Sequence, residues 1–155
     1  MPNMDWNCLT PLQLGRYAEY FAKMEFASYG YEVYTSEVDD HGVDFVTKLG
    51  NSPFLEVQVK SVRGNGYVFM NKNKFDITNE SLLLCLLIFE PNKLPEIYLI
   101  PATAWAAPNE FLVSHDYRLD QKSKPEWGLN LSKKNMKHLA EYKAQDFFTD
   151  RRSRI

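Results

Sequence analysis

The feature that most constrains the fold is an unbroken run of eight apolar residues from Leu82 to Phe89, LLLCLLIF. It is far shorter than the about 20 residues that a membrane-spanning helix needs. A strand with one face in water alternates apolar and polar residues, whereas a strand covered on both faces is apolar throughout. The run therefore predicts a central strand of a sheet with further structure packed on both sides, which indicates an α/β fold.

A long helix is predicted before the first strands. Thr10 supplies an N-cap hydroxyl, Pro11 the first helical residue, and Gln13 completes a capping box. Apolar residues then recur at helical spacing until Gly30, which favours a C-terminal stop. Three strands with turn residues between them should follow as an antiparallel meander, over residues 32–38, 43–48 and 54–62.

The remaining elements are expected in chain order. They are a short strand at 67–70, the strand at 82–89, a strand at 96–100, a helical piece at 103–106, an extended segment at 111–113, a polar loop at 116–128 and a last helix at 131–143. At 155 residues the chain can bury a core without disulfide or metal staples. We expect one domain over 1–155, with a core at about 12–100, a C-terminal extension at about 101–150 and a loose basic tail at 151–155.

The distribution of charge and the positions of the cysteines indicate which surfaces and cross-links to expect. The net charge is −2, but residues 121–155 carry nine Lys/Arg against four Asp/Glu. This basic third fits either a phosphate-binding surface or a solvated helix with an Arg-rich tail. The N-terminus lacks the basic and apolar stretches of a secretory signal, so we expect a cytoplasmic protein. Cys8 and Cys85 lie far apart, and Cys85 falls within the apolar run, so no disulfide is expected.

Most of the candidate functional side chains lie on the predicted strand at 54–62. Glu56, Gln58 and Lys60 alternate on one face, while the other face is apolar. Burying such groups is costly unless they pair or bind something. Asp44 lies in the preceding strand, where a hairpin places it opposite this row, and Glu19 of the first helix has the reach to join them. A buried ion-pair and amide cluster of purely structural role is the alternative interpretation.

Carboxylates that converge from strands and a helix suit Mg²⁺, which takes one or two of them together with water and substrate phosphate. A lysine beside such an ion can orient an attacking water or help to deprotonate it. This combination indicates a phosphodiester hydrolase.

In these segments the chain resembles the PD-(D/E)xK nuclease superfamily, which includes restriction endonucleases and Holliday-junction resolvases. The matching segments, in order, are LGRYAE at 14–19, GYEV at 30–33, GVDFV at 42–46 and QVK at 58–60. The resemblance implies a restriction-endonuclease-like core, a central mixed sheet with an antiparallel meander flanked by helices. It also implies that Asp44 binds Mg²⁺, or Mn²⁺ as a substitute, that Lys60 acts on water, and that Glu19 supports the site.

One position departs from the family pattern. The family usually has Asp or Glu where this chain has Gln58, which offers a carbonyl oxygen without charge. The QxK form resembles that of Mrr-like restriction enzymes and some intron-encoded homing endonucleases. Glu56, on the same face, is a candidate for the missing metal-binding carboxylate. Two functions therefore stay open: a metal-dependent nuclease acting on DNA, or a nuclease-like domain without catalysis that binds nucleic acid or a protein partner.

Further expectations concern substrate contacts and assembly. Arg63, Lys72 and Lys74 follow the lysine strand and are candidates for contacts with the nucleic-acid backbone. A cut through both strands of DNA needs two active sites, so a homodimer is expected.

Overall fold

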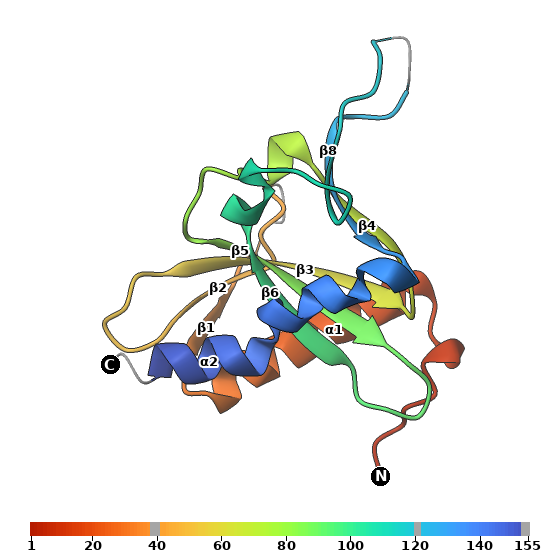
Figure 1. The fold of residues 1–155 in the computed structure, drawn as a ribbon. Coiled ribbons are helices and arrows are strands. Elements are labelled where there is room, and N and C mark those ends of the chain that lie inside the picture. The colour runs from red at the N-terminus through yellow and green to blue at the C-terminus, as the bar shows by residue number, and fades with distance from the viewer. Residues whose placement is uncertain (38–40, 120–121, 153–155) are drawn as a thin grey trace.

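The computed structural model describes residues 1–37, 41–119 and 122–152. Within these ranges the chain forms eight strands, two α-helices, three short 3-10 helices and one long 3-10 helix (Figure 1). In order they are η1 (Trp6–Cys8), α1 (Pro11–Ser28), β1 (Glu32–Thr35), β2 (Phe45–Lys48), β3 (Leu55–Arg63), β4 (Gly66–Asn71), η2 (Lys72–Lys74), β5 (Leu82–Phe89), β6 (Glu96–Pro101), η3 (Ala102–Ala106), β7 (Leu112–His115), β8 (Glu126–Leu131), η4 (Lys133–Tyr142) and α2 (Ala144–Arg152).

The first helix begins and ends where the sequence predicts. The Thr10 side chain accepts a hydrogen bond from the backbone of Gln13, and the Gln13 side chain accepts one from the backbone of Thr10. At the other end Gly30 takes a φ of 89°, which lets the chain turn sharply into β1. The helix buries one stripe on the main sheet, formed by Leu14, Ala18, Ala22 and Phe26.

The main sheet has five strands in the order β1-β2-β3-β5-β6. The predicted meander β1-β2-β3 is antiparallel, β3 and β5 are parallel, and β5 and β6 are antiparallel, which confirms the mixed sheet. Every residue of β5 is buried, as its sequence predicts. The expected strand end at residue 38 and the first half of the turn expected over 39–42 lie outside the described residues.

A second sheet was not predicted. β4, expected as an extra short strand, pairs with β8, and β8 pairs with β7, all antiparallel. The expectation of a polar loop over 116–128 was wrong at its end, because β8 begins at Glu126. Its alternating apolar residues are interrupted by Gly128, which obscured the strand pattern. The β3–β5 crossover that parallel pairing requires is therefore built from β4 and the short 3-10 helix η2 rather than from an α-helix.

The C-terminal helix also differs from the prediction. Residues 133–142 form the 3-10 helix η4, and a separate helix α2 follows over 144–152, so Arg151 is helical rather than part of a loose tail. Residues 153–155 lie outside the described part of the chain.

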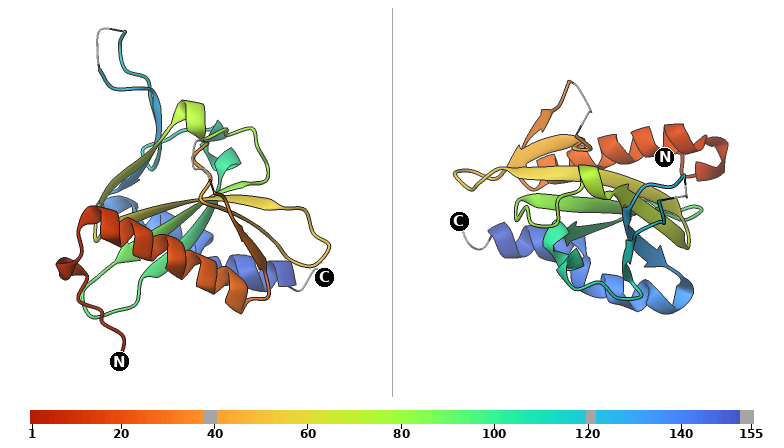
Figure 2. Two further views of the ribbon diagram at one scale, coloured as in Figure 1. Left: turned by 180° about the vertical axis from the view of Figure 1, so that it is seen from behind. Right: turned by 90° about the horizontal axis from the view of Figure 1, so that it is seen from above.

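Two apolar clusters lie on the two faces of the main sheet. One contains the buried stripe of α1 together with Phe148 of α2, and the other joins β5 and β6 to the second sheet through residues such as Leu84 and Leu129. Figure 2 shows α1 on one side of the sheet and the second sheet on the other. Within the described part of the chain, no helix has the length and apolar character needed to cross a membrane.

Candidate active site

Asp44 stands at the point where β2 joins the sheet. Its backbone N–H donates to the carbonyl of Val57 at 2.9 Å, and its Oδ2 accepts a hydrogen bond from the backbone N–H of Val59 at 2.7 Å. The side chain therefore takes the place of a neighbouring strand as the partner of Val59. This contact fixes the Asp44 carboxylate beside the middle of β3, between the positions of Gln58 and Lys60.

The polar row of β3 points toward the face that carries the second sheet. In the parallel register, Gln58 lies opposite Leu84 and Lys60 opposite Leu86, and both leucines belong to the cluster between the sheets. Gln58 is only 8% exposed, and its Oε1 has no hydrogen-bond partner among the described residues. A buried oxygen without a partner is costly, so Gln58 presents an acceptor that a ligand can satisfy.

Gly42 brings the loop before Asp44 against this row. It has a φ of 79°, and a Cβ built on it would lie 3.0 Å from the carbonyl oxygen of Lys74 and 3.6 Å from Nε2 of Gln58. A side chain at this position would be strained by the backbone and crowded by η2. Glycine thus lets three segments meet: the loop before β2, the middle of β3 and η2.

Lys60 is half-buried on the same face as Gln58. Within the described ranges, no hydrogen bond or ion pair engages its ammonium group. A half-buried cation beside a carboxylate-bearing loop is suited to hold an anionic group such as a phosphate.

Glu56 is held by a residue that the sequence analysis missed. Its carboxylate accepts a hydrogen bond from Nδ2 of Asn79, in the turn that leads into β5. Successive same-face residues on a strand are about 6.6 Å apart, so Glu56 and Gln58 are neighbours on one face. The sequence does show an asparagine in the turn before a central strand. Nothing in its position along the chain, however, indicates that it contacts Glu56, 23 residues earlier.

The structure does not bring Glu19 into this group. Its Oε2 pairs with Nη1 of Arg16 at 3.2 Å on the surface of α1. Among the residues with described positions, no three His, Cys, Asp or Glu side chains gather closely enough to hold a metal ion. The acidic part of the site is therefore Asp44 with Glu56 nearby, and the role expected for Glu19 stays a prediction.

Two of the three basic residues expected to meet nucleic acid have other partners. Nη2 of Arg63 donates to the carbonyls of Trp6 and Leu9, which ties the N-terminal segment to the end of β3. Lys72 pairs with Asp116, whereas Lys74 is exposed. These contacts use Arg63 and Lys72 within the protein itself.

The Asp44 carboxylate also affects a buried thiol. Burial is the main cause that raises the pKa of the Cys85 thiol, and the negative charge of Asp44 adds to it. Cys85 is therefore a neutral, buried side chain and no candidate nucleophile.

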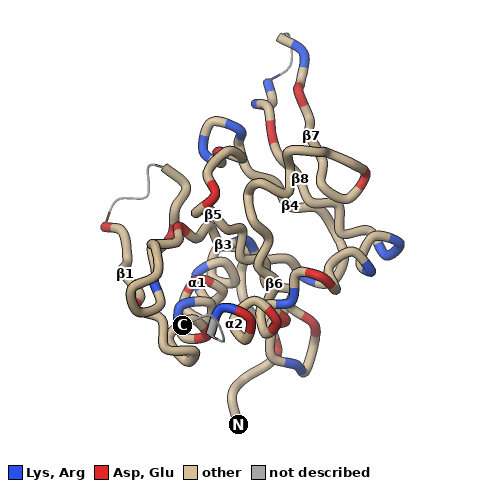
Figure 3. The backbone as a smooth tube through the Cα atoms, turned by 60° about the vertical axis from the view of Figure 1, so that its left-hand side comes forward, with Lys and Arg blue, Asp and Glu red and all other residues tan. Residues whose placement is uncertain are grey.

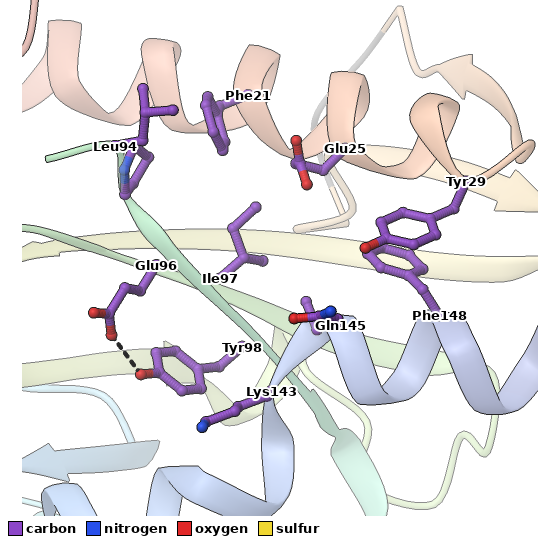
Figure 4. A pocket seen from close by; sticks show the side chains of 12 residues that line it. Phe21, Glu25, Tyr29, Leu94, Glu96, Ile97, Tyr98, Lys143, Gln145 and Phe148 are labelled. Atoms are coloured by element: carbon purple, nitrogen blue, oxygen red, sulfur yellow. Dashed lines mark hydrogen bonds between the residues drawn. The ribbon is translucent and has the colours of Figure 1, made fainter.

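A cavity of about 470 Å³ lies away from these residues, between α1, α2 and β6 (Figure 4). Tyr29 stacks on Phe148 at one end of it, with a centroid distance of 4.3 Å. The polar row of β3 does not line this cavity, so the candidate site and the cavity are separate features of the structure.

Comparison with known proteins places the fold. No protein-family model matches the chain, and neither does any curated protein sequence. Among solved structures, the chain is similar to a Holliday junction resolvase from the archaeal hyperthermophile Archaeoglobus fulgidus, at 12% identity and a TM-score of 0.48, covering 75% of this chain and 83% of that one. It is also similar to a bacterial homing endonuclease, at 23% identity and a TM-score of 0.50, covering 75% of this chain and 82% of that one. The likeness to the homing endonuclease shows a restriction-endonuclease-like α/β fold, as the sequence resemblance implied.

Proposed function

We propose that this chain is a metal-dependent nuclease that hydrolyses phosphodiester bonds of DNA. The observation that carries the proposal is the placement of three polar residues at the middle of β3. The Asp44 carboxylate is fixed on the Val59 N–H, and Val59 is flanked by the half-buried Lys60 and by Gln58, whose Oε1 has no hydrogen-bond partner in the described part of the chain. The fold, shared with the homing endonuclease, supports the same class of reaction.

The oxygen ligands fit a hard divalent cation. Asp44 provides a carboxylate, Gln58 provides a buried acceptor without a partner among the described residues, and Glu56 is the neighbouring residue on the same face of the strand. Mg²⁺ is commonly held by one or two carboxylates and completes its shell with water and substrate phosphate, so a set this small is sufficient. Mn²⁺ accepts the same ligands. When bound, the ion neutralises charge on the phosphate and lowers the pKa of bound water.

The protein residues supply positioning and charge. The Lys60 ammonium donates hydrogen bonds to a non-bridging phosphate oxygen and to the attacking water, which aligns the water with the phosphorus. The water oxygen forms the new bond to phosphorus as the bond to the leaving oxygen breaks; the attacking water loses its proton to surrounding solvent, and the leaving oxygen takes up a proton from solvent. Hydrogen bonds from Lys60 are strongest as negative charge builds up on the phosphate, and this differential stabilisation lowers the barrier.

A second function is favoured by the small number of carboxylates at the site. Gln58 carries no charge, and Glu19 is paired with Arg16 on the surface of α1, so the site has fewer carboxylates than the family pattern. A domain that binds nucleic acid or a protein partner without cutting would have this composition.

The nuclease function has a consequence for assembly. Cleavage of both strands of a duplex needs two such sites, which a homodimer would provide.

The test is cleavage of supercoiled, linear, single-stranded and branched DNA, and of RNA, with Mg²⁺ or Mn²⁺. The wild type is compared with Asp44→Asn and Lys60→Ala, and with Lys134→Ala as a control at an exposed lysine of η4. We expect metal-dependent cutting by the wild type and the control, and a loss of at least about 100-fold in the two site variants. Cutting that survives in both site variants would place the activity elsewhere. Binding of DNA without cutting by the wild type would favour the second function.

A further inference from the structure

The face of the main sheet that turns away from α1 is covered over only part of its width. The apolar cluster on that face joins β5 and β6 to the second sheet, and it includes no residue of β1 or β2, both of which the structure describes in full. Figure 3 shows β1 at one side of the main sheet and β4, β7 and β8 at the other, and the views in Figures 1 and 2 agree. The second sheet therefore leaves the face over β1 and β2 uncovered.

Strand register places this uncovered part in line with the candidate site. Tyr34 of β1 lies opposite Val46 of β2, and Val46 lies opposite Glu56 of β3. Residues directly opposite one another share a face of the sheet. Adjacent strands are about 4.8 Å apart, so Tyr34 lies about 10 Å from Glu56 across the sheet. Tyr34 is therefore on the same face as the polar row of β3.

Two aromatic side chains meet on the uncovered part. Tyr34 is 48% exposed and Phe54, just before β3, is 50% exposed, and their ring centroids are 5.9 Å apart. Nζ of Lys48 lies 5.0 Å from the centroid of the Phe54 ring. Single exposed apolar side chains are common on protein surfaces, whereas these two rings contact each other beside the candidate site. We call Tyr34, Phe54 and Lys48 the aromatic platform.

Polar contacts hold the aromatic platform in position. The Tyr34 hydroxyl donates to Oε2 of Glu32 at 2.7 Å, and Nζ of Lys48 lies 3.9 Å from the same oxygen. Glu32 thus connects the ring of Tyr34 with the cation beside Phe54, and the two contacts offset its negative charge. Side chains that are already held in place lose less conformational entropy when a ligand binds, which favours binding.

The aromatic platform lies a short distance along β3 from the proposed site of cleavage. Phe54 precedes Gln58 by four residues, about 13 Å along an extended strand, and Lys60 lies about 7 Å farther on. The polar row offers an ammonium group and metal-binding oxygens for phosphates, and the platform offers rings for a base. A DNA strand laid along β3 meets both.

We infer that the aromatic platform stacks an unpaired base of the DNA strand that the proposed site cleaves. This inference rests on the proposed nuclease function and narrows its substrate to DNA with a single-stranded segment near the cleaved bond. A duplex covers the faces of its bases within its own stack, whereas a single strand presents them, and every base has a flat face that stacks on an aromatic ring. Lys48 adds a cation for the phosphate of the stacked nucleotide.

The test measures binding of a labelled single strand of about 15 nucleotides and of a duplex of the same sequence, with Ca²⁺ in place of Mg²⁺. The platform variant Tyr34→Leu, Phe54→Leu removes both rings and keeps apolar side chains. The control variant Tyr20→Leu, Phe69→Leu makes the same exchange at exposed positions of α1 and β4. We expect the platform variant to weaken binding of the single strand by about 5- to 150-fold, the loss of one stacked base, and the control variant to weaken it by less than about 2-fold.

Two comparisons distinguish stacking from other effects of the substitutions. A strand of abasic spacers keeps the phosphates and lacks the bases, so the wild type and the platform variant should bind it equally. The variant Tyr34→Phe, Phe54→Tyr keeps both rings and should bind the normal strand within about 2-fold of the wild type. Circular dichroism and thermal unfolding verify that each variant is folded.

The outcomes separate this inference from the proposed function. If the wild type cuts DNA and the platform variant binds the single strand as the wild type or the control variant does, the inference is wrong and the nuclease proposal stands. A wild type that cuts duplex DNA but does not bind the single strand has the same meaning. A platform variant with an altered oligomeric state in size-exclusion chromatography would assign the rings to a protein interface and would also overturn the inference. If the wild type binds the single strand through the platform but cuts no DNA, the stacking site stands and the nuclease proposal fails.

Discussion

Oδ2 of Asp44 lies 2.7 Å from the backbone nitrogen of Val59 and accepts its hydrogen bond. Val59 is flanked in sequence by Gln58 and Lys60, so this bond holds the Asp44 carboxylate level with both. The aspartate consequently has a structural task, because it pairs with a backbone N–H of β3 just before β2 begins, and it also provides a negative charge at the proposed metal site.

Two substitutions separate these tasks of Asp44. Asp44→Asn keeps an oxygen that can accept from Val59 but loses the charge, so we expect near-wild-type stability and a loss of cleavage of at least about 100-fold. Asp44→Ala removes the acceptor as well and should also lower the free energy of unfolding by about 1–3 kcal/mol, the cost of an unsatisfied N–H. Urea denaturation and cleavage rates measure the two effects. Equal stability of the two variants would mean that the hydrogen bond contributes nothing measurable.

Gln58→Glu supplies the carboxylate found in the usual family pattern. Because position 58 is buried near Asp44, the introduced charge should lower the melting temperature in EDTA. Mg²⁺ should reverse this loss, since an ion that binds only the folded state stabilises it, by about 2.7 kcal/mol at 100 times its Kd. Differential scanning fluorimetry with and without Mg²⁺ tests this, with Glu56→Gln as a comparison. A variant whose melting temperature ignores Mg²⁺ would argue against a metal at this position.

Replacing each of two glycines with alanine should change the free energy of unfolding in opposite directions. Gly42→Ala forces a side chain onto a φ of 79° and toward the Lys74 carbonyl, so we expect a loss of about 1–2 kcal/mol and weakened cleavage as η2 shifts. Gly15→Ala lies within α1, and nothing lies within 4 Å of the added Cβ. It should therefore raise stability by about 0.5–1 kcal/mol through helix propensity. Urea denaturation of both variants measures whether the free energy of unfolding falls in Gly42→Ala and rises in Gly15→Ala.

The sequence predicted the elements whose signals are local. The capping box at Thr10, the alternation from Leu55 onward and the apolar run ending at Phe89 each depend on neighbours in the chain, and each element formed where expected. The second sheet was missed because β8 was expected to be largely loop and because β4 pairs with β8 across a long stretch of the chain. In β8, Gly128 breaks the alternation, and the reason for this glycine is the ring of Tyr67, which occupies the space a Cβ would need.

The same limit applies to the candidate site. The alternation of side chains along a strand was enough to predict that Gln58 and Lys60 share a face. The pairing of two consecutive strands was enough to predict that Asp44 lies beside them. Partners supplied by distant segments were not predictable in this way. From the sequence, Arg63 was a candidate for contacts with nucleic acid, yet in the structure it donates a hydrogen bond to a carbonyl of the N-terminal segment. Lys72 likewise donates to Ser114, which lies more than forty residues away in the chain. A basic residue is assigned to a ligand or to the fold only when its three-dimensional neighbours are known.

Thiol reactivity provides a direct test of the core beneath Asp44. Cys85 is buried and its pKa is raised, so at pH 8 its reactive thiolate is scarce and reagent cannot reach it, whereas Cys8 is exposed. We expect a disulfide reagent such as DTNB to modify one thiol of the native protein rapidly and both thiols in denaturant. Cys8→Ser should remove the rapid phase. Asp44→Ala removes the nearby charge but leaves Cys85 buried, so slow modification should persist in that variant as long as it stays folded. Rapid modification of both thiols in the native wild type would mean that the central strand is accessible to solvent, contrary to its burial on both faces of the sheet.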